Sequence, residues 1–217
     1  MANLWTLARE REQPDFQYMD QETLEQIKFN KPVFKDSDTE FCFTQKDLDL
    51  VLDSAPAEDW YLRKEIISSI HGVAHTIRVM VYAYILAKDE IDQSVLKALL
   101  LACAVHDTQR LNDKGDEQHE ERALEYFKDK FADNENYELI CQILEGTHEY
   151  EKYLRTADAL DRYRLPKVKW WIDDSYLETK PEESLKSFAF DLIVCSEQRM
   201  LQGTDHKSGV IGCLAII

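Results

Sequence analysis

The sequence predicts an all-α fold, because its apolar residues recur at helical spacing and no segment resembles a strand. Val73, Ile77 and Met80 repeat at the spacing of one helical face, and similar patterns occur along much of the chain. No segment shows convincing alternation of apolar and polar residues bounded by turns, as a half-buried strand would. The 217 residues, 44% of them hydrophobic and 31% charged, are enough for one fair-sized helical core.

Residues 1–45 predict an N-terminal arm that is mostly irregular and packs on the main domain. Within it, only residues 21–29 favour a short helix. A further helix is expected to begin after Thr44, a good N-cap residue with Asp47 three residues later. Pro56 makes continuation of that helix unfavourable.

The central segment predicts two long apolar helices. Residues 60–88 have helical periodicity interrupted at Gly72, and residues 95–105 form an almost unbroken apolar run. Asp92 is a candidate N-cap for the helix that carries this run. A polar loop rich in turn formers follows at residues 110–116.

Four further helices are expected, at residues 120–131, 136–147, 153–164 and 181–201. We expect a helical core at residues 46–166 and a C-terminal helical extension, packed on that core, at residues 167–217. The apolar residues 210–217 either cover an edge of the core or mediate self-association, so a homo-oligomer is one interpretation.

The composition argues against long nucleic acids and membranes as partners. With 26 basic and 42 acidic residues, the formal net charge of −16 repels phosphate backbones at long range. A small anionic substrate stays compatible, since a bound cation and a few arginines can reverse the field inside a pocket. No apolar run reaches the roughly 18 residues of a membrane span, and the N-terminus becomes charged too early for a signal peptide.

A cytoplasmic location is therefore expected, and the cysteines are interpreted in that light. They are odd in number, widely separated and without a C-x-x-C pair, so we expect reduced, mostly buried thiols. These residues are Cys42, Cys103, Cys141, Cys195 and Cys213.

The apolar run over residues 95–105 delivers His106 and Asp107 to the edge of the predicted core. A charged carboxylate there must be paired, hydrogen bonded or bound to a cation. Imidazole nitrogen and carboxylate oxygen together suit divalent ions such as Mn²⁺, Fe²⁺, Co²⁺, Ni²⁺, Zn²⁺ or Mg²⁺. Taken alone, the pair is better explained as a helix end with a local ion pair, so the metal hypothesis needs partners from elsewhere.

An ordered series of polar residues supplies candidate partners. His71, His75 and Arg78 are spaced i, i+4 and i+7, which would place them on one face of the same predicted helix. One or two candidates then come from each successive helix, in the order His75, His106 with Asp107, His119, His148 and Asp158. Helical bundles build metal sites from inward-facing side chains on several helices, so the series predicts a metal site.

Three segments carry a resemblance to a known family: HGVAHTIRV at 71–79, AVHDTQRLNDKGDEQH at 104–119 and ADALDRYRL at 157–165. They resemble the HD-domain superfamily of metal-dependent phosphohydrolases, and more narrowly its small bacterial members, which have the order H…HD…D on an all-helical domain. The resemblance implies as metal ligands His75, His106, Asp107 and Asp158. One departure is Glu120, which follows His119 where the family often has glycine.

The resemblance further implies a metal-dependent phosphohydrolase that acts on a small phosphorylated substrate, for which a nucleotide is one candidate. One or two ions of Mn²⁺, Mg²⁺, Fe²⁺, Co²⁺ or Ni²⁺ would activate water for attack on phosphorus. Arg110, three residues after Asp107, is expected to clamp the phosphate with its forked guanidinium, and Arg78 is the second choice.

Several roles stay open from the sequence. His119 and His148 are expected either to bind a second ion or to donate a proton to the leaving oxygen. His71 either orients a ligand, contacts phosphate or is structural beside Gly72.

Asp161 lies at i+3 from Asp158 and could replace it as a ligand. The resemblance favours Asp158, with Asp161 paired to Arg162 or Arg164. Two other functions use the same residues: a non-catalytic helical regulator that binds a metal or nucleotide, and an iron-dependent oxygenase.

Overall fold

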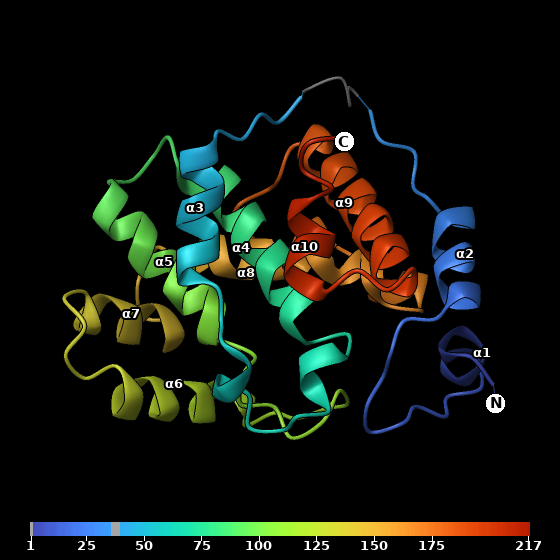
Figure 1. The fold of residues 1–217 in the computed structure, drawn as a ribbon, viewed down its shortest axis with the longest axis horizontal. Coiled ribbons are helices and arrows are strands. Elements are labelled where there is room, and N and C mark those ends of the chain that lie inside the picture. Colours follow the sequence, from blue (N-terminus) through green and yellow to red (C-terminus); the bar gives the residue numbers. More distant parts are fainter. Residues whose placement is uncertain (1, 36–39) are drawn as a thin grey trace.

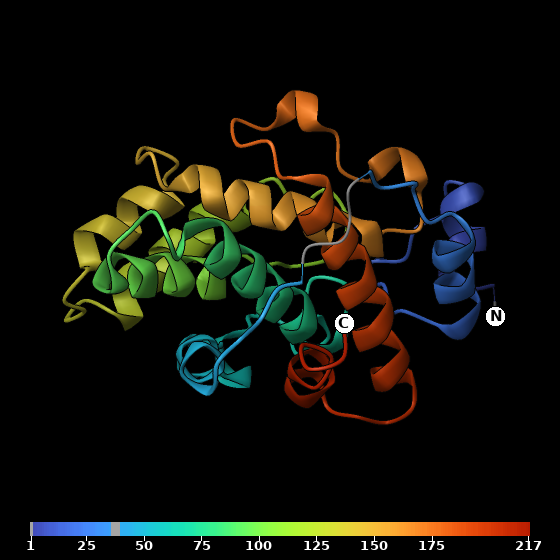
Figure 2. The ribbon, with the colours of Figure 1, turned by 90° about the horizontal axis from the view of Figure 1, so that it is seen from above.

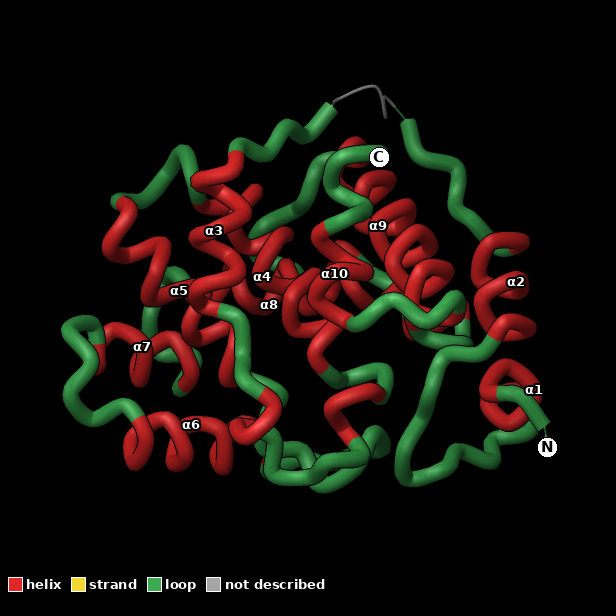
Figure 3. The backbone as a smooth tube through the Cα atoms, in the orientation of Figure 1, coloured by secondary structure: helices red, strands yellow, loops and turns green. Residues whose placement is uncertain are grey.

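The computed structural model describes residues 2–35 and 40–217, and its regular structure is entirely helical. Ten α-helices and five short 3-10 helices are present in those residues, joined by loops and without a strand (Figure 3). The predicted all-α fold is confirmed. None of the described helices is both long enough and apolar enough to cross a membrane.

The centre of the molecule is helix α4 (Val73–Ala87), which is mostly apolar and buried on every side. All residues from Val73 to Tyr84 are buried, because four helices from later in the chain contact it in addition to one earlier helix. The later helices matter most for the site. These are α5 (Gln93–Val105), α8 (Glu151–Leu160), α9 (Glu183–Leu201) and α10 (His206–Ile211). Figure 1 shows α4 and α8 in the middle of the ribbon.

Helix α4 begins at Val73, so the long helix predicted over residues 60–88 exists only in its second half. Before Gly72 the chain forms 3-10 helices at Glu58–Trp60 and Ile66–Ser68. A Cβ atom on Gly72 would lie 2.3 Å from the carbonyl oxygen of Ile66 and closer still to that of Ile67. Only glycine permits this approach, which sharply turns the chain into α4. His71 therefore precedes α4 and does not share a helical face with His75, contrary to the prediction.

Three helices complete the far side of the core. Helix α3 (Gln45–Ser54) packs on α4 and α5, and the predicted capping interaction of Thr44 with Asp47 is present. Helices α6 (His119–Lys130) and α7 (Tyr137–Leu144) pack against each other, and α7 also packs on α5. In Figures 1 and 2 they lie at the opposite end of the molecule from the N-terminus.

The N-terminal arm contains helix α1 (Leu4–Arg9) in addition to the expected helix α2 (Gln21–Phe29). The two contact each other, and α2 packs on α9. Between them the chain runs back to the core, where the backbone N–H of Asp113 donates to the carbonyl of Asp15 at 2.7 Å. The arm is therefore attached at both α9 and the loop that follows α5.

The C-terminal extension packs on α4, and its apolar end covers part of the core. Val210, Cys213 and Leu214 are buried there. Cys195 and Cys213 form a disulfide, so the prediction that all five cysteines are reduced is wrong. The two cysteines are 18 residues apart in the sequence, and the turn between α9 and α10 brings them together. The other three cysteines are free, with Cys42 exposed.

The close approach of Gly72 to the backbone of Ile66 and Ile67 predicts that a larger residue at position 72 destabilises the fold. Gly72→Ala should lower the free energy of unfolding by about 1–3 kcal/mol, because the new methyl group overlaps backbone oxygens that cannot move independently. Gly115→Ala is the matched control, since a Cβ there meets nothing within 4 Å. Urea unfolding followed by circular dichroism measures both, and equal midpoints for the two variants would contradict the prediction.

Candidate metal centre

The four residues predicted as metal ligands come together between α4, α5 and α8. The Nε2 atom of His75 lies 3.3 Å from Oδ2 of Asp107 and 3.4 Å from Oδ1 of Asp158. The Nε2 atom of His106 lies 3.8 Å from Oδ2 of Asp107. Ligand atoms of His75, His106 and Asp107 all lie within 4.8 Å of one another, so these three could hold one ion. Asp158 is placed to complete the set from α8.

Both imidazole rings are fixed in the orientation that a metal ligand needs. Nδ1 of His106 donates to the carbonyl of Cys103 at 2.6 Å, and Nδ1 of His75 is 2.8 Å from Oδ2 of Asp161. These acceptors retain the ring proton at Nδ1 and leave the lone pair at Nε2. Both Nε2 atoms are buried without a hydrogen-bond partner. Lone pairs that face carboxylate oxygens repel them unless a cation lies among them, so the donor set fits a divalent ion.

Asp161 lies behind His75, and Arg78 holds it there. Arg78 donates from Nε to Oδ1 of Asp161 at 2.6 Å and from Nη2 to Oδ2 at 3.1 Å. Burial would raise the pKa of Asp161, but Arg78, His75 and Arg164 hold the pKa well below its usual value. Asp161 is thus an ionised carboxylate that orients the ring of His75, while Asp158 is the one that faces the ligand cluster.

Arg78 is 1% exposed and cannot contact a substrate, so the prediction that it binds phosphate is wrong. Its remaining donor, Nη1, is used by Glu197 at 2.9 Å and Ser196 at 3.1 Å, both on α9. The predicted contact of Asp161 with Arg164 is present, at 3.5 Å between Oδ2 and Nη1, but Arg78 is its main partner.

Asp107 and Arg110 form the second charged part of the centre. Helix α5 ends at Val105, and a turn brings Nε of Arg110 to 3.2 Å from Oδ1 of Asp107. Burial would raise the pKa of Asp107, but Arg110, His106 and His75 hold the pKa well below its usual value. Nε and Nη1 of Arg110 are buried and make no hydrogen bond. Because Nε faces Asp107, Nη1 is the donor that has no acidic partner and could serve an anion.

Of the two remaining predicted histidines, one joins the centre. His119, the first residue of α6, donates from Nδ1 to the carbonyl of Asp116, and its Nε2 lies 3.2 Å from Oδ1 of Asp107. His148 lies in the turn before α8, where its Nδ1 accepts from the N–H of Tyr150 at 3.2 Å. No described contact joins His148 to the ligand cluster, so the structure does not place it as a second-metal ligand.

Sequence reasoning missed Asp113, which connects two other segments, the N-terminal arm and the segment before α4, beside the candidate ligands. Its carboxylate accepts from the N–H of Gln17 at 2.7 Å and from Ser69 Oγ at 2.8 Å, and Nδ1 of His71 lies 2.7 Å from it. Burial raises the pKa of Asp113 to about 6. Burial, together with the positive charges of Arg164 and Arg110, holds the pKa of His71 well below its ordinary value, so this ring is neutral at neutral pH. The signal was present in the LND segment that follows Arg110.

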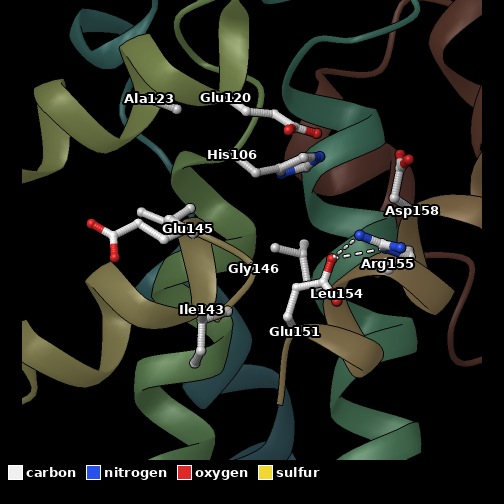
Figure 4. Close-up of a pocket in the computed structure, with 11 residues that line it drawn as sticks. His106, Glu120, Ala123, Ile143, Glu145, Gly146, Glu151, Leu154, Arg155 and Asp158 are labelled. Carbon is white, nitrogen blue, oxygen red and sulfur yellow. Dashed lines mark hydrogen bonds and ion pairs between the residues drawn. The ribbon is translucent and has the colours of Figure 1, made fainter. Parts of the chain in front are cut away.

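Two cavities share the exposed edge of the ligand cluster. One, of about 300 Å³, has four basic side chains in its wall: Arg110, Lys114, Arg162 and Arg164. The other, of about 270 Å³, lies between α6, α7 and α8. Both are lined by His106, Glu120 and Asp158, and Figure 4 shows these three side chains at the edge of the smaller cavity.

Comparisons with protein-family models, with curated proteins and with solved structures find no match for this chain.

The contact between Asp161 and His75 predicts a loss of metal affinity on mutation. Asp161→Asn should weaken binding of Mn²⁺ or Ni²⁺ about 10- to 100-fold, because the neutral amide holds the ring of His75 less firmly and lowers its basicity. Asp191→Asn, an exposed α9 carboxylate paired with Lys31, is the control. Calorimetric titration of metal into folded protein measures both, and wild-type affinity in folded Asp161→Asn would refute the assigned role.

The surroundings of His106 predict a lowered pKa for its imidazole ring in metal-free protein. Burial disfavours the imidazolium form and, despite the nearby carboxylates of Asp107 and Asp158, lowers the pKa of His106 from its ordinary 6.5. In metal-free protein the ring should therefore be neutral at pH 7, protonated at Nδ1, with a midpoint below 6.5. Long-range ¹H–¹⁵N spectra recorded as the pH falls measure this. A midpoint at or above 6.5, or a proton on Nε2, would contradict the prediction.

Proposed function

We propose that the protein is a metal-dependent phosphohydrolase that cleaves a phosphoester bond in a small substrate. The observation that carries the proposal is the pair of buried, unpartnered Nε2 atoms on His75 and His106, which face the carboxylates of Asp107 and Asp158. The resemblance to the HD-domain superfamily supports the same function, and membership of that superfamily is part of this proposal.

His75, His106, Asp107 and Asp158 would hold one divalent ion. Two imidazole nitrogens favour Mn²⁺, Fe²⁺, Co²⁺ or Ni²⁺ over Mg²⁺, which prefers oxygen ligands. When bound, such an ion polarises a phosphoryl oxygen and lowers the pKa of water.

The residues around the ligand set would bind and orient the substrate. Arg110 would receive the phosphate, because it lines the larger cavity, its Nη1 lacks a hydrogen-bond partner and its planar guanidinium matches phosphoryl oxygens. Arg164 cannot offer its full guanidinium, since it donates to the carbonyls of Ile70 and Asp161, but its charge lies in the same cavity wall. Nε2 of His119, beside Asp107, is placed to exchange a proton with a group bound there.

The proposal predicts separate effects on metal binding and on turnover. Arg110→Ala should lower kcat/KM for phosphomonoesters about 100-fold, because charge on the transferred phosphoryl group loses its partner, while bound metal stays near one ion per chain. Arg63→Ala is the control, since Arg63 is half-buried outside both cavities, where it contacts Glu65 and the ring of Phe16.

Elemental analysis and a phosphoester panel with Mn²⁺, Co²⁺, Ni²⁺ and Mg²⁺ provide the measurement. Protein that takes up no divalent metal would overturn the proposal. Metal uptake and saturable nucleotide binding without turnover would instead favour the non-catalytic regulator.

A further inference from the structure

The smaller cavity has no part in phosphate recognition, yet it opens on the same ligand cluster. It shares His106, Glu120 and Asp158 with the larger cavity, and otherwise its wall comes from α6, α7 and α8. A phosphoester bound at the cluster with its phosphate toward Arg110 would have this second space available for the group on the other side of the ester oxygen.

The two cavities differ in charge. The larger one has four basic side chains and four carboxylates in its wall, so their charges balance. The smaller one also has four carboxylates, one of them the proposed ligand Asp158, but only Arg155 opposes them. Arg155 is already neutralised, because its Nε lies 2.8 Å and its Nη2 2.7 Å from Oε1 of Glu151 (Figure 4). Glu145 pairs with Lys128 at the solvent-exposed rim, at 3.0 Å, where water screens the pair. Glu120 has no ion pair among the described residues, and Figure 4 shows its carboxylate turned toward His106.

The rest of the smaller cavity is aliphatic. Ala123, Ile143, Leu144 and Leu154 form its apolar wall, and no phenylalanine, tyrosine or tryptophan lines it. Nucleobases usually stack on aromatic side chains, and this cavity offers none. An aliphatic wall with negative charge at its edge instead suits a small alkyl group that carries a positive charge.

We propose that this cavity binds a cationic leaving group, which makes the substrate a phosphate monoester of an amino alcohol. The inference depends on the proposed phosphohydrolase function and specifies its substrate class. In the reaction, the oxygen of water bonds to phosphorus as the bond from phosphorus to the ester oxygen breaks. The departing oxygen takes a proton that the water releases, so the products are the amino alcohol and inorganic phosphate.

Charged and neutral substrates of the same shape test the inference. Phosphocholine is compared with 3,3-dimethylbutyl phosphate, and phosphoethanolamine with propyl phosphate, on the full chain loaded with Mn²⁺. Both kcat/KM and the calorimetric Kd are measured. At least one cationic ester should be preferred over its neutral partner by about 10-fold or more in both quantities.

A charge variant locates the preference. Glu120→Gln should reduce the ratio between the cationic and neutral esters several-fold, whereas Glu121→Gln, on the next position of α6 and outside both cavities, should retain it. Because a ratio is measured, a general loss of activity in Glu120→Gln does not imitate the expected result. A ratio that is unchanged in Glu120→Gln would contradict the role of this carboxylate.

The outcomes separate the two proposals. Equal turnover and equal binding within both pairs would overturn the inference and leave the phosphohydrolase function in place. Tighter binding of the cationic esters without turnover would support the cavity assignment and contradict the phosphohydrolase. If none of the four esters binds, the inference is overturned, and the phosphohydrolase function is then decided by the metal analysis and the wider phosphoester panel.

Discussion

The buried ion pair between Asp161 and Arg78 is the contact on which the geometry of the candidate metal centre depends. Both side chains are almost wholly excluded from water, so each would be strongly unfavourable alone, and removal of one partner from such a pair typically costs about 3–5 kcal/mol. The pair is completed on one side by His75 and on the other by Glu197. Through it, helix α9 determines the position of a ligand on α4, although α9 carries none of the segments that resemble a known family.

A second buried polar cluster, around Asp113, links the N-terminal arm to the candidate site. Asp113 connects the backbone of Gln17 with Ser69 and His71, and so holds the arm against the wall of the larger cavity. Segments from both ends of the chain thus surround the ligand cluster. The whole chain has a net charge of −16, but the charges around the candidate ligands are unevenly distributed. Four basic side chains balance the carboxylates of the larger cavity, whereas carboxylates are in excess in the smaller one. If the protein acts on a dipolar phosphoester as proposed, this asymmetry would favour one orientation of that substrate.

Much of the fold could be predicted from the sequence, because local physics fixes it. The run over 95–105 is too apolar to be anything but buried, so His106 and Asp107 had to emerge at the edge of the core. The capping pair at Thr44 and the all-helical class followed from spacing alone. The convergence of His75 with this dyad and Asp158 was likewise anticipated, although its metal content stays a prediction.

The sequence by itself determined which residues are polar within apolar helices, and hence which could form a centre. Only the tertiary structure decided which of them face one another. Asp158 and Asp161 have similar helical phase, but the position of Arg78 makes one a candidate ligand and the other its support. The same packing buries Arg78 and places His148 outside the ligand cluster. The reason is that periodicity fixes the phase of side chains within one helix, whereas the angle and depth at which two helices pack depend on the whole core.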